Sequence, residues 1–226
     1  SDERRLGPKQ FLANSDSSLE GFEVVDFNSD SFQDIATASN STGEIRWMEN
    51  RLFEEEDSTF LVMDLDHVTR ATSLRTADLD GDGDIDLIAS AYGGIGIAWY
   101  ENRLNQEEGD FSSAVLLDGP EECPEDIFPV DLNLDGATDI VSIFSVSGNV
   151  VWYPNRVTGE GAEFGSRRVL AEGFAQGSRI VAGDIDKDGD YDLIVGSAER
   201  GEIALFENKL ISDDVTAGFL GTWIVY

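Results

Sequence analysis

Basic residues, cysteine and histidine are all scarce in this chain of 226 residues. Fifteen lysines and arginines stand against 46 aspartates and glutamates, which gives a formal net charge of −31. A field of that sign repels nucleic acid and anionic membrane surfaces and attracts cations and basic partners, so we expect no nucleic-acid partner. The single cysteine, Cys123, excludes an internal disulfide framework. No apolar run approaches the roughly 18 residues that span a bilayer, so no direct membrane insertion is expected.

The apolar content, in contrast, is that of an ordinary globular protein. Hydrophobic residues make up 41% of the chain, which is enough for a packed core. Self-repulsion among so many carboxylates works against a compact state. Bound divalent ions would offset that repulsion, so a metal-binding protein is expected.

A nine-residue acidic motif occurs four times at an almost constant spacing. Its copies begin at residues 26, 78, 131 and 184, which lie 52, 53 and 53 residues apart. They follow the pattern D-x-[DN]-x-D-G-x-x-D, with Ser31 in place of the glycine in the first copy. A second motif, Trp-x-x-Asn, keeps the same step and ends at residues 50, 102, 155 and 208, with Leu205 in place of the last tryptophan. Two motifs locked to one period indicate a structural repeat.

Each repeat predicts four short strands. In the last two copies, runs such as 178–183, 193–196, 149–153 and 168–170 are short, rich in β-branched and aromatic residues, and bounded by turn residues. Four strands in about 50 residues are typical of one blade of a β-propeller. We therefore predict an all-β propeller segment with four antiparallel, four-stranded blades. The blades are expected at residues 21–64, 72–117, 127–170 and 178–226.

Residues 10–13 resemble one more outer strand, from a preceding blade or from a blade that closes the ring. The apolar ending at 222–226 favours the first alternative. Because six to eight blades are more usual than four, we expect this chain to be part of a larger propeller.

The acidic motifs offer the oxygen ligands that calcium prefers. Ca²⁺ takes six to eight oxygens at about 2.3–2.6 Å. Positions 1, 3, 5 and 9 carry carboxylate or amide oxygens, position 7 can offer its backbone carbonyl, and a glycine at position 6 permits a sharp turn. The expected ligands are Asp26, Asn28, Asp30, Phe32 and Asp34 in the first loop; Asp78, Asp80, Asp82, Asp84 and Asp86 in the second; Asp131, Asn133, Asp135, Ala137 and Asp139 in the third; and Asp184, Asp186, Asp188, Asp190 and Asp192 in the fourth.

Electrostatics and spacing favour calcium in these loops over two alternatives. Two unit charges 4 Å apart repel by roughly 4 kcal/mol at an effective dielectric of 20, so converging carboxylates need a cation. Solvated Asp-Gly turns could explain one such loop, but not four in register. An EF-hand would need a glutamate at position 12, where Ala89, Ser142 and Val195 stand within predicted strands. We expect two to four calcium ions.

The four loops differ in their expected affinity for calcium. The second and fourth have four carboxylates at positions 1, 3, 5 and 9 and the glycine at position 6. The third has three carboxylates and an amide, and the first also has Ser31 instead of glycine. The predicted order is therefore second and fourth, then third, then first.

The acidic loops, followed by Leu-Ile-Ala-Ser (87–90) or Leu-Ile-Val-Gly (193–196) and then by Trp-x-Glu-Asn, resemble FG-GAP/VCBS repeats. These repeats form propeller blades in integrin α-chain heads, fungal lectins and many microbial surface proteins. The resemblance covers nearly the whole chain and implies calcium in the hairpin between the first two strands of each blade, with a structural rather than a catalytic role. Ser31 and Leu205 depart from the pattern, which weakens the first metal loop and the last aromatic marker.

The face opposite the acidic loops is where propellers usually bind ligands. Its loops contain five candidate ligand-binding residues: Tyr92, His67, Arg70, Phe174 and Arg200. Tyr92 is suited to stacking on a sugar or a peptide, although such a residue can also simply cover a turn. Trp47, Trp99 and Trp152 recur at one strand position and are expected to pack between blades.

These features predict a calcium-binding module, lectin-like or adhesive, that binds a protein or a glycan. It is expected outside the cell or on its surface, with an organelle lumen as the alternative. A second reading is an architectural subunit with structural calcium in a larger assembly, and a third is a propeller enzyme that acts on glycans. His67 and Cys123 could form a base–nucleophile pair, but no third group is evident, so we do not expect an enzyme.

Overall fold

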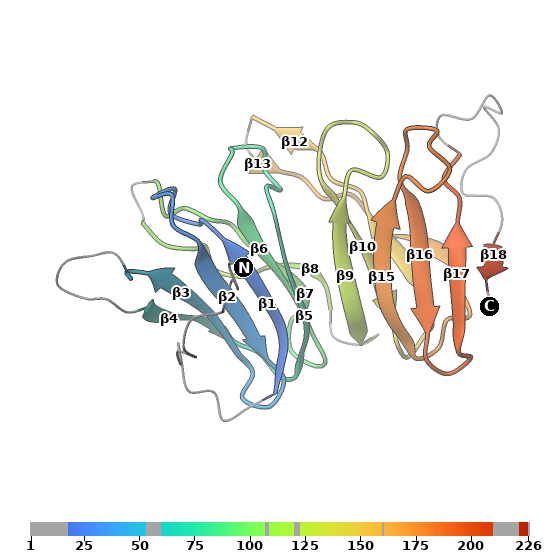
Figure 1. Ribbon diagram of the computed structural model, residues 1–226, viewed down its shortest axis with the longest axis horizontal. Coiled ribbons are helices and arrows are strands. Elements are labelled where there is room, and N and C mark those ends of the chain that lie inside the picture. The colour runs from blue at the N-terminus through green and yellow to red at the C-terminus, as the bar shows by residue number, and fades with distance from the viewer. Residues whose placement is uncertain are drawn as a thin grey trace, which may run out of the picture.

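The computed structural model describes residues 18–52, 60–106, 109–119, 123–159, 161–209 and 222–225. Every regular element in these ranges is a β-strand (Figure 1). Within the same ranges, no helix is long or apolar enough to cross a membrane. The predicted strand at 10–13 lies outside the described residues.

Sixteen of the strands form four antiparallel sheets of four strands each. Blade 1 contains β1 (Leu19–Val25), β2 (Asp34–Ser39), β3 (Glu44–Asn50) and β4 (Phe60–His67). Blade 2 contains β5 (Ala71–Ala77), β6 (Asp86–Ala91), β7 (Gly96–Tyr100) and β8 (Val115–Asp118). Blade 3 contains β9 (Pro124–Val130), β10 (Asp139–Phe144), β11 (Val150–Tyr153) and β14 (Arg168–Ala171). Blade 4 contains β15 (Gly177–Gly183), β16 (Asp192–Ser197), β17 (Glu202–Phe206) and β18 (Thr222–Val225).

The predicted fold class is therefore confirmed: the chain is all-β and repeats a four-stranded antiparallel blade. One feature of blade 3 has no counterpart in the prediction. Between β11 and β14, a short hairpin forms from β12 (Val157–Thr158) and β13 (Gly161–Ala162).

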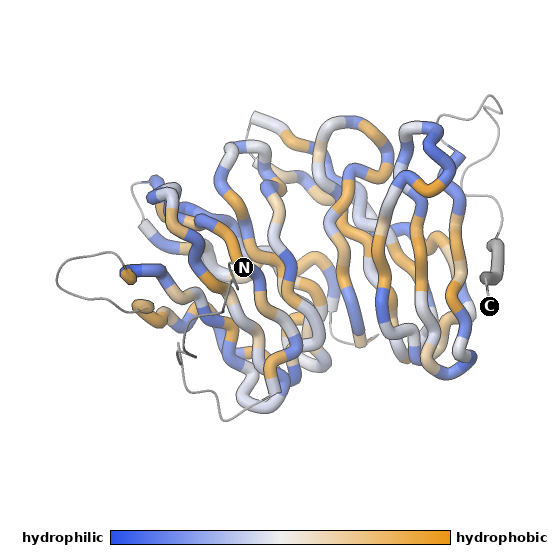
Figure 2. The backbone as a smooth tube through the Cα atoms, in the orientation of Figure 1, coloured by the Kyte–Doolittle hydropathy of each residue, from blue (hydrophilic) through white to orange (hydrophobic). Residues whose placement is uncertain are grey.

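Three hydrophobic clusters join the blades, and each cluster lies between two neighbouring sheets. Hydrophobic residues recur along the strands of all four blades (Figure 2). Between blades 1 and 2 the cluster includes Phe27, Ile45, Trp47, Leu74 and Tyr100; between blades 2 and 3, Leu79, Ile97, Trp99, Ile127 and Tyr153; and between blades 3 and 4, Leu132, Val141, Val150, Ile180 and Phe206. We call the face that a blade turns toward the preceding blade its back face, and the face that it turns toward the following blade its front face. The same terms are used for the equivalent faces of blades 1 and 4.

The recurring tryptophans lie in these junctions. Trp47 of blade 1 contacts Phe111, which follows β7 of blade 2, with ring centroids 6.0 Å apart. Trp99 of blade 2 contacts Phe164 of blade 3 at 6.3 Å. The predicted packing between blades is confirmed for both residues.

The four blades stand in an open row, with blade 1 at one end and blade 4 at the other (Figure 1). Because the strands are antiparallel, the first and third loops of each blade emerge at one rim and the second loop at the opposite rim. The acidic loops therefore share one rim, the upper one in Figure 1. The loops that contain the candidate ligand-binding residues lie at the other.

Candidate metal centres and the opposite loop face

Each acidic loop turns sharply at two positions where the backbone has a positive φ. At position 6, φ is 75° for Ser31 and 94° for Gly83, so the serine adopts the conformation for which the glycine was expected. Position 4 also has a positive φ in every loop, although only one loop has a glycine there; the residues are Ser29, Gly81, Leu134 and Lys187. Sequence reasoning missed this second turn.

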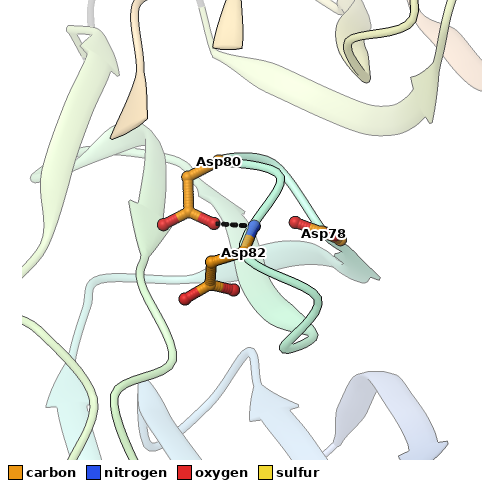
Figure 3. A group of neighbouring side chains, drawn as sticks. All are labelled: Asp78, Asp80 and Asp82. Atoms are coloured by element: carbon orange, nitrogen blue, oxygen red, sulfur yellow. Dashed lines mark hydrogen bonds between the residues drawn. The ribbon is translucent and has the colours of Figure 1, made fainter. Parts of the chain in front are cut away.

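Carboxylates at positions 1, 3 and 5 converge in loops 2 and 4. In loop 2, Asp78, Asp80 and Asp82 each offer an oxygen that lies within 4.8 Å of the others. The Asp80 and Asp82 carboxylates lie side by side, and the Asp82 N–H donates to Asp80 Oδ1 at 3.2 Å (Figure 3). Asp184, Asp186 and Asp188 converge in the same way in loop 4. An all-oxygen set of this kind fits a hard cation such as calcium.

Loops 1 and 3 differ from loops 2 and 4 because an asparagine occupies position 3. Asn28 donates its side-chain N–H to Asp30 Oδ2 at 3.0 Å. Asn133 makes the same bond to Asp135 Oδ2 at 2.9 Å. The amide thus supplies a donor to the position 5 carboxylate, whereas loops 2 and 4 place a second carboxylate there. In loops 2 and 4 the carboxylates at positions 3 and 5 therefore repel each other without such a donor between them.

Backbone N–H groups also stabilise the loop carboxylates. The position 7 N–H donates to the position 5 carboxylate at 2.8–3.2 Å in all four loops, which places the backbone of Phe32, Asp84, Ala137 and Asp190 beside the cluster. Asp78 accepts N–H groups from Gly81 at 2.7 Å and Gly83 at 3.1 Å. Asp26 and Asp131 each accept two N–H groups from their own loops.

Burial raises the pKa of Asp80 to about 6. The negative charges of Asp82 and Glu101 contribute to this rise in the pKa, and the N–H of Asp82 opposes it. Glu101 belongs to the Trp-x-Glu-Asn motif and was not among the predicted ligands. Its charge adds to the negative potential at loop 2.

The position 9 aspartates are placed differently from the other predicted ligands. Asp34, Asp86, Asp139 and Asp192 are all buried, at 0–1% exposure. One oxygen of each accepts the N–H of the loop's second residue at 3.0–3.2 Å, and the other accepts the N–H of the motif asparagine at 2.6–2.8 Å. Burial raises the pKa of Asp86 to about 7 and that of Asp139 to about 6, although these N–H bonds act in the opposite direction. The carboxylates at position 9 therefore tie the start of the loop to the end of the third strand.

The motif asparagine is a structural residue whose role the sequence did not reveal. The side chain of Asn102 donates to Ile85 O at 3.0 Å in its own blade and to Phe27 O at 2.8 Å in blade 1. Asn155 and Asn208 repeat this pattern with the preceding blade, each bonding to the carbonyl of position 2 at 2.7–3.0 Å. The asparagine thus joins adjacent blades beside the acidic loop. Its recurrence at one period was the available signal.

Segments of blades 2 and 3 cover loop 2. From blade 2, Asn105 donates to Asp84 Oδ1 at 3.0 Å and Gln106 donates to Asp82 Oδ2 at 3.1 Å. From blade 3, Val157 of the β12–β13 hairpin lies so close to Gly81 that a Cβ there would be 2.9 Å from Val157 Cγ1. Asp80 of loop 2 is buried although Asp82 is exposed, whereas both Asp184 and Asp186 of loop 4 are exposed.

Two of the five candidate ligand-binding residues line a cavity at the opposite rim. Arg70 and Tyr92 of blade 2 line it together with residues of blades 3 and 4, among them Glu125 and Ser145, and it encloses about 490 Å³. The Arg70 guanidinium lies 4.7 Å from the centre of the Tyr92 ring. The Tyr92 hydroxyl contacts Glu125 and lies 2.8 Å from Ser145 Oγ. Tyr92 is therefore half-buried and fixed rather than freely exposed.

The other three candidates do not line this cavity. His67 is exposed at the end of β4, and its backbone N–H donates to Asp66 Oδ1 at 2.7 Å. Arg200 is exposed near Glu202, at 3.8 Å. Phe174 is buried in the core, with its ring centre 5.5 Å from that of Phe206, because the packing of blade 3 against blade 4 draws it inward.

A search of solved structures gives a similar chain in the crystal structure described as BBS1N in complex with ARL6DN, soaked with lead. The identity is 18%, the TM-score is 0.45, and the match covers 91% of this chain and 55% of that one. This chain thus spans about half the length of the solved one. Among curated proteins, none matches the sequence.

A family model described as FG-GAP-like repeat matches three overlapping segments, at residues 26–89, 78–142 and 131–195. Each match begins at the first aspartate of an acidic loop and ends within the second strand of the next blade. The matches together span three quarters of the chain, from 26 to 195. They confirm the resemblance found in the sequence, and the chain belongs to the FG-GAP-like repeat family.

Proposed function

We propose that this propeller module binds calcium in its acidic loops and uses the opposite loop face to bind a protein or a glycan. The convergence of Asp78, Asp80 and Asp82, repeated by the same positions in loop 4, is the observation that carries the calcium part. Three carboxylates within 4.8 Å of one another repel strongly unless a cation lies between them. The oxygen-only donor set favours Ca²⁺ over softer metals.

The proposed role is binding rather than catalysis, at the cell surface or outside the cell. Extracellular calcium modules bind the ion with dissociation constants of about 10⁻⁴–10⁻³ M, which suits sites built on short exposed loops. In loop 2, Asp78 and Asp80 accept backbone N–H groups and Asp82 accepts the side-chain amide of Gln106, which favours a structural role for the ion. An architectural role in a larger assembly is a second candidate, and exposed hydrophobic residues on blade 4 favour it.

Calcium titration by calorimetry tests the metal sites. The wild-type chain is expected to bind at least two ions. Asp80→Ala should remove one of the stronger sites, whereas Asp30→Ala should leave both. Equal losses from the two substitutions would contradict the order of affinity, and an absence of binding at millimolar calcium would refute the calcium proposal.

The cavity lined by Arg70 and Tyr92 is the proposed ligand site. Its lining combines a guanidinium, a carboxylate and hydroxyls with the apolar side chains of Val146 and Ala198, which suits a ligand with both polar and apolar parts, such as a sugar unit or a peptide. A glycan array and a screen of immobilised peptides would identify the ligand class. Arg70→Ala should abolish the signal. The control is Arg156→Ala, because Arg156 is an exposed arginine at the acidic rim. Equal signals from both variants would place the ligand elsewhere.

A further inference from the structure

The rim opposite the acidic loops repeats one backbone contact in blades 2, 3 and 4. The residue that precedes the first strand of each blade has a positive φ, which is 57° at Arg70, 55° at Cys123 and 53° at Gln176. Its carbonyl accepts, at 3.0–3.1 Å, the N–H of the first residue after the second strand; these residues are Tyr92, Ser145 and Ala198. Three blades thus share one equivalent position, and its side chains differ greatly in size.

Tyr92 occupies this position at the junction between the front face of blade 2 and the back face of blade 3. Its hydroxyl reaches two residues of blade 3: it contacts Glu125 and lies 2.8 Å from Ser145 Oγ. A tyrosine ring packed between two elements usually has such partners for its hydroxyl. An aromatic ring therefore fills the rim of this junction.

The same position leaves a cavity at the junction of blades 3 and 4. By the repeat, a ring at position 145 would reach Ala198 and Ser178, because Ser178 and Glu125 are each the second residue of the first strand in their blades. The side chain of Ser145 is too short to reach them. All three residues line the cavity of about 490 Å³ described above. The cavity thus includes the place that a ring occupies one junction earlier.

The lining can bind both a ring and a hydroxyl group. Val146, which is 66% exposed, and Ala198 offer apolar contacts. The one bond that the Ser178 hydroxyl makes to the described residues is to Gly196 O at 3.5 Å, which is long, so this hydroxyl can still pair with a ligand. Gln176 is exposed in the same lining, and its amide can bond to both the N–H and the C=O groups of a peptide backbone.

We propose that this cavity binds a peptide through a tyrosine side chain, whose ring takes the place between blades 3 and 4 that Tyr92 takes between blades 2 and 3. The ring packs on Val146 and Ala198, and its hydroxyl bonds to Ser178. A peptide is favoured over a glycan because the neighbouring junction holds this same amino-acid ring in an equivalent setting. The inference rests on the proposed binding role of the cavity and adds the class of ligand.

Saturation-transfer NMR on the whole chain tests the ligand class with two terminally blocked tripeptides, Gly-Tyr-Gly and Gly-Ala-Gly. The ring protons of Gly-Tyr-Gly should receive saturation at millimolar peptide. Gly-Ala-Gly should bind at least about tenfold more weakly, because it buries no ring. Equal signals from the two tripeptides, or no transfer to Gly-Tyr-Gly, overturn the inference.

Filling the cavity with the chain's own ring tests the location. Ser145→Tyr should abolish the transfer to Gly-Tyr-Gly. Ser147→Tyr is the matched control, since Ser147 is exposed in the same loop and does not line the cavity, and it should bind as the wild type does. Thermal denaturation checks that both variants are folded. Binding that survives Ser145→Tyr overturns the inference, and the tripeptide comparison decides it even if this variant does not fold.

The failure of this inference is distinguishable from the failure of the proposed ligand site. A glycan, or a peptide without tyrosine, that binds the wild type and is lost in Arg70→Ala would overturn the tyrosine inference alone. Array signals that Arg70→Ala and Ser145→Tyr both leave intact would place the ligand outside the cavity, which overturns the proposed site together with this inference.

Discussion

The side chain of Asn102 in blade 2 donates a hydrogen bond of 2.8 Å to the carbonyl oxygen of Phe27 in blade 1, and it is fully buried there. The same side chain donates to Ile85 O at 3.0 Å. One amide group therefore satisfies two backbone carbonyls from two blades. The contact lies next to the acidic loops, so it links the alignment of adjacent blades to the position of those loops.

Asn102→Leu is expected to destabilise the protein strongly. The substitution leaves two carbonyl groups without their donor, at a cost of about 1–3 kcal/mol for each buried group. Urea denaturation would measure the loss in the free energy of unfolding. Asn105→Ala is the control, since the bonds of Asn105 to Ser29 and Asp84 are exposed, and it should cost little. Similar losses for the two variants would contradict the bridging role.

Ser31→Gly is expected to stabilise blade 1. Ser31 has a φ of 75°, and the left-handed conformation costs a residue with a Cβ about 1–2 kcal/mol. Part of this gain is offset because glycine loses more backbone entropy on folding. The net effect should be a rise in the thermal midpoint. The reverse change, Gly136→Ser, should lower it, because Gly136 has a φ of 91° and open space where its Cβ would be, so conformation alone decides the effect. A rise or no change with Gly136→Ser would show that the turn does not need glycine.

The sequence was sufficient to predict the blades because strand signals and the acidic motif recur with one period. Strands separated by a fixed step must occupy equivalent places, so the sheet order follows from the repeat. The convergence of the carboxylates at positions 1, 3 and 5 in loops 2 and 4 also follows from the sequence, since alternating side chains on a tight loop converge. These are local features, and they need no knowledge of how the blades pack.

The features that the sequence did not predict depend on contacts between blades or on the backbone. Asn102 and Phe27 are 75 residues apart, and nothing in either motif identifies the other as its partner. Leu134 and Lys187 adopt a positive φ without glycine. In loop 3, Asp131 accepts the N–H groups of the two residues after Leu134, and the turn at Leu134 makes these bonds possible. Phe174 was expected on the ligand-binding loop face. It is buried instead, because Phe206 of the next blade packs against its ring.

Asp118 is expected to stabilise the fold at neutral pH and to lose this contribution in acid. Burial tends to raise its pKa, but hydrogen bonds from Tyr153 and Arg167 outweigh this and hold the pKa below its usual range. Its contribution to stability is therefore fully present above the unfolded-state pKa of about 4, and it is lost as the pH falls through the lower folded-state pKa. The difference in unfolding free energy between the wild-type protein and Asp118→Asn should be clear at pH 7 and shrink below about pH 4.

Urea denaturation at a series of pH values measures this difference. Asp64→Asn is the control, because the ion pair of Asp64 with Arg46 is exposed and contributes little at any pH. A difference for Asp118→Asn that stays constant from neutral to acidic pH would contradict the assigned cause.

Calcium should determine whether aspartate or asparagine at position 3 of an acidic loop gives the more stable protein. In loop 3, Asn133 donates to Asp135, whereas in loop 2 Asp80 faces Asp82. In excess chelator, Asp80→Asn should therefore raise the thermal midpoint, because one repulsive charge is replaced by a donor, with a gain of about 1 kcal/mol.

In millimolar calcium the wild-type protein should have a higher thermal midpoint than Asp80→Asn. The asparagine variant loses a charged ligand and with it much of the stabilisation by the bound ion. That stabilisation amounts to about 2.7 kcal/mol for a site at a hundredfold excess of calcium over its dissociation constant. Asn133→Asp should show the opposite pair of effects, with a lower midpoint in chelator and a larger gain from calcium. Thermal denaturation of the three proteins in both solutions measures all of these differences. If the midpoints of all three are the same with and without calcium, the carboxylates of these loops are not held together by the ion.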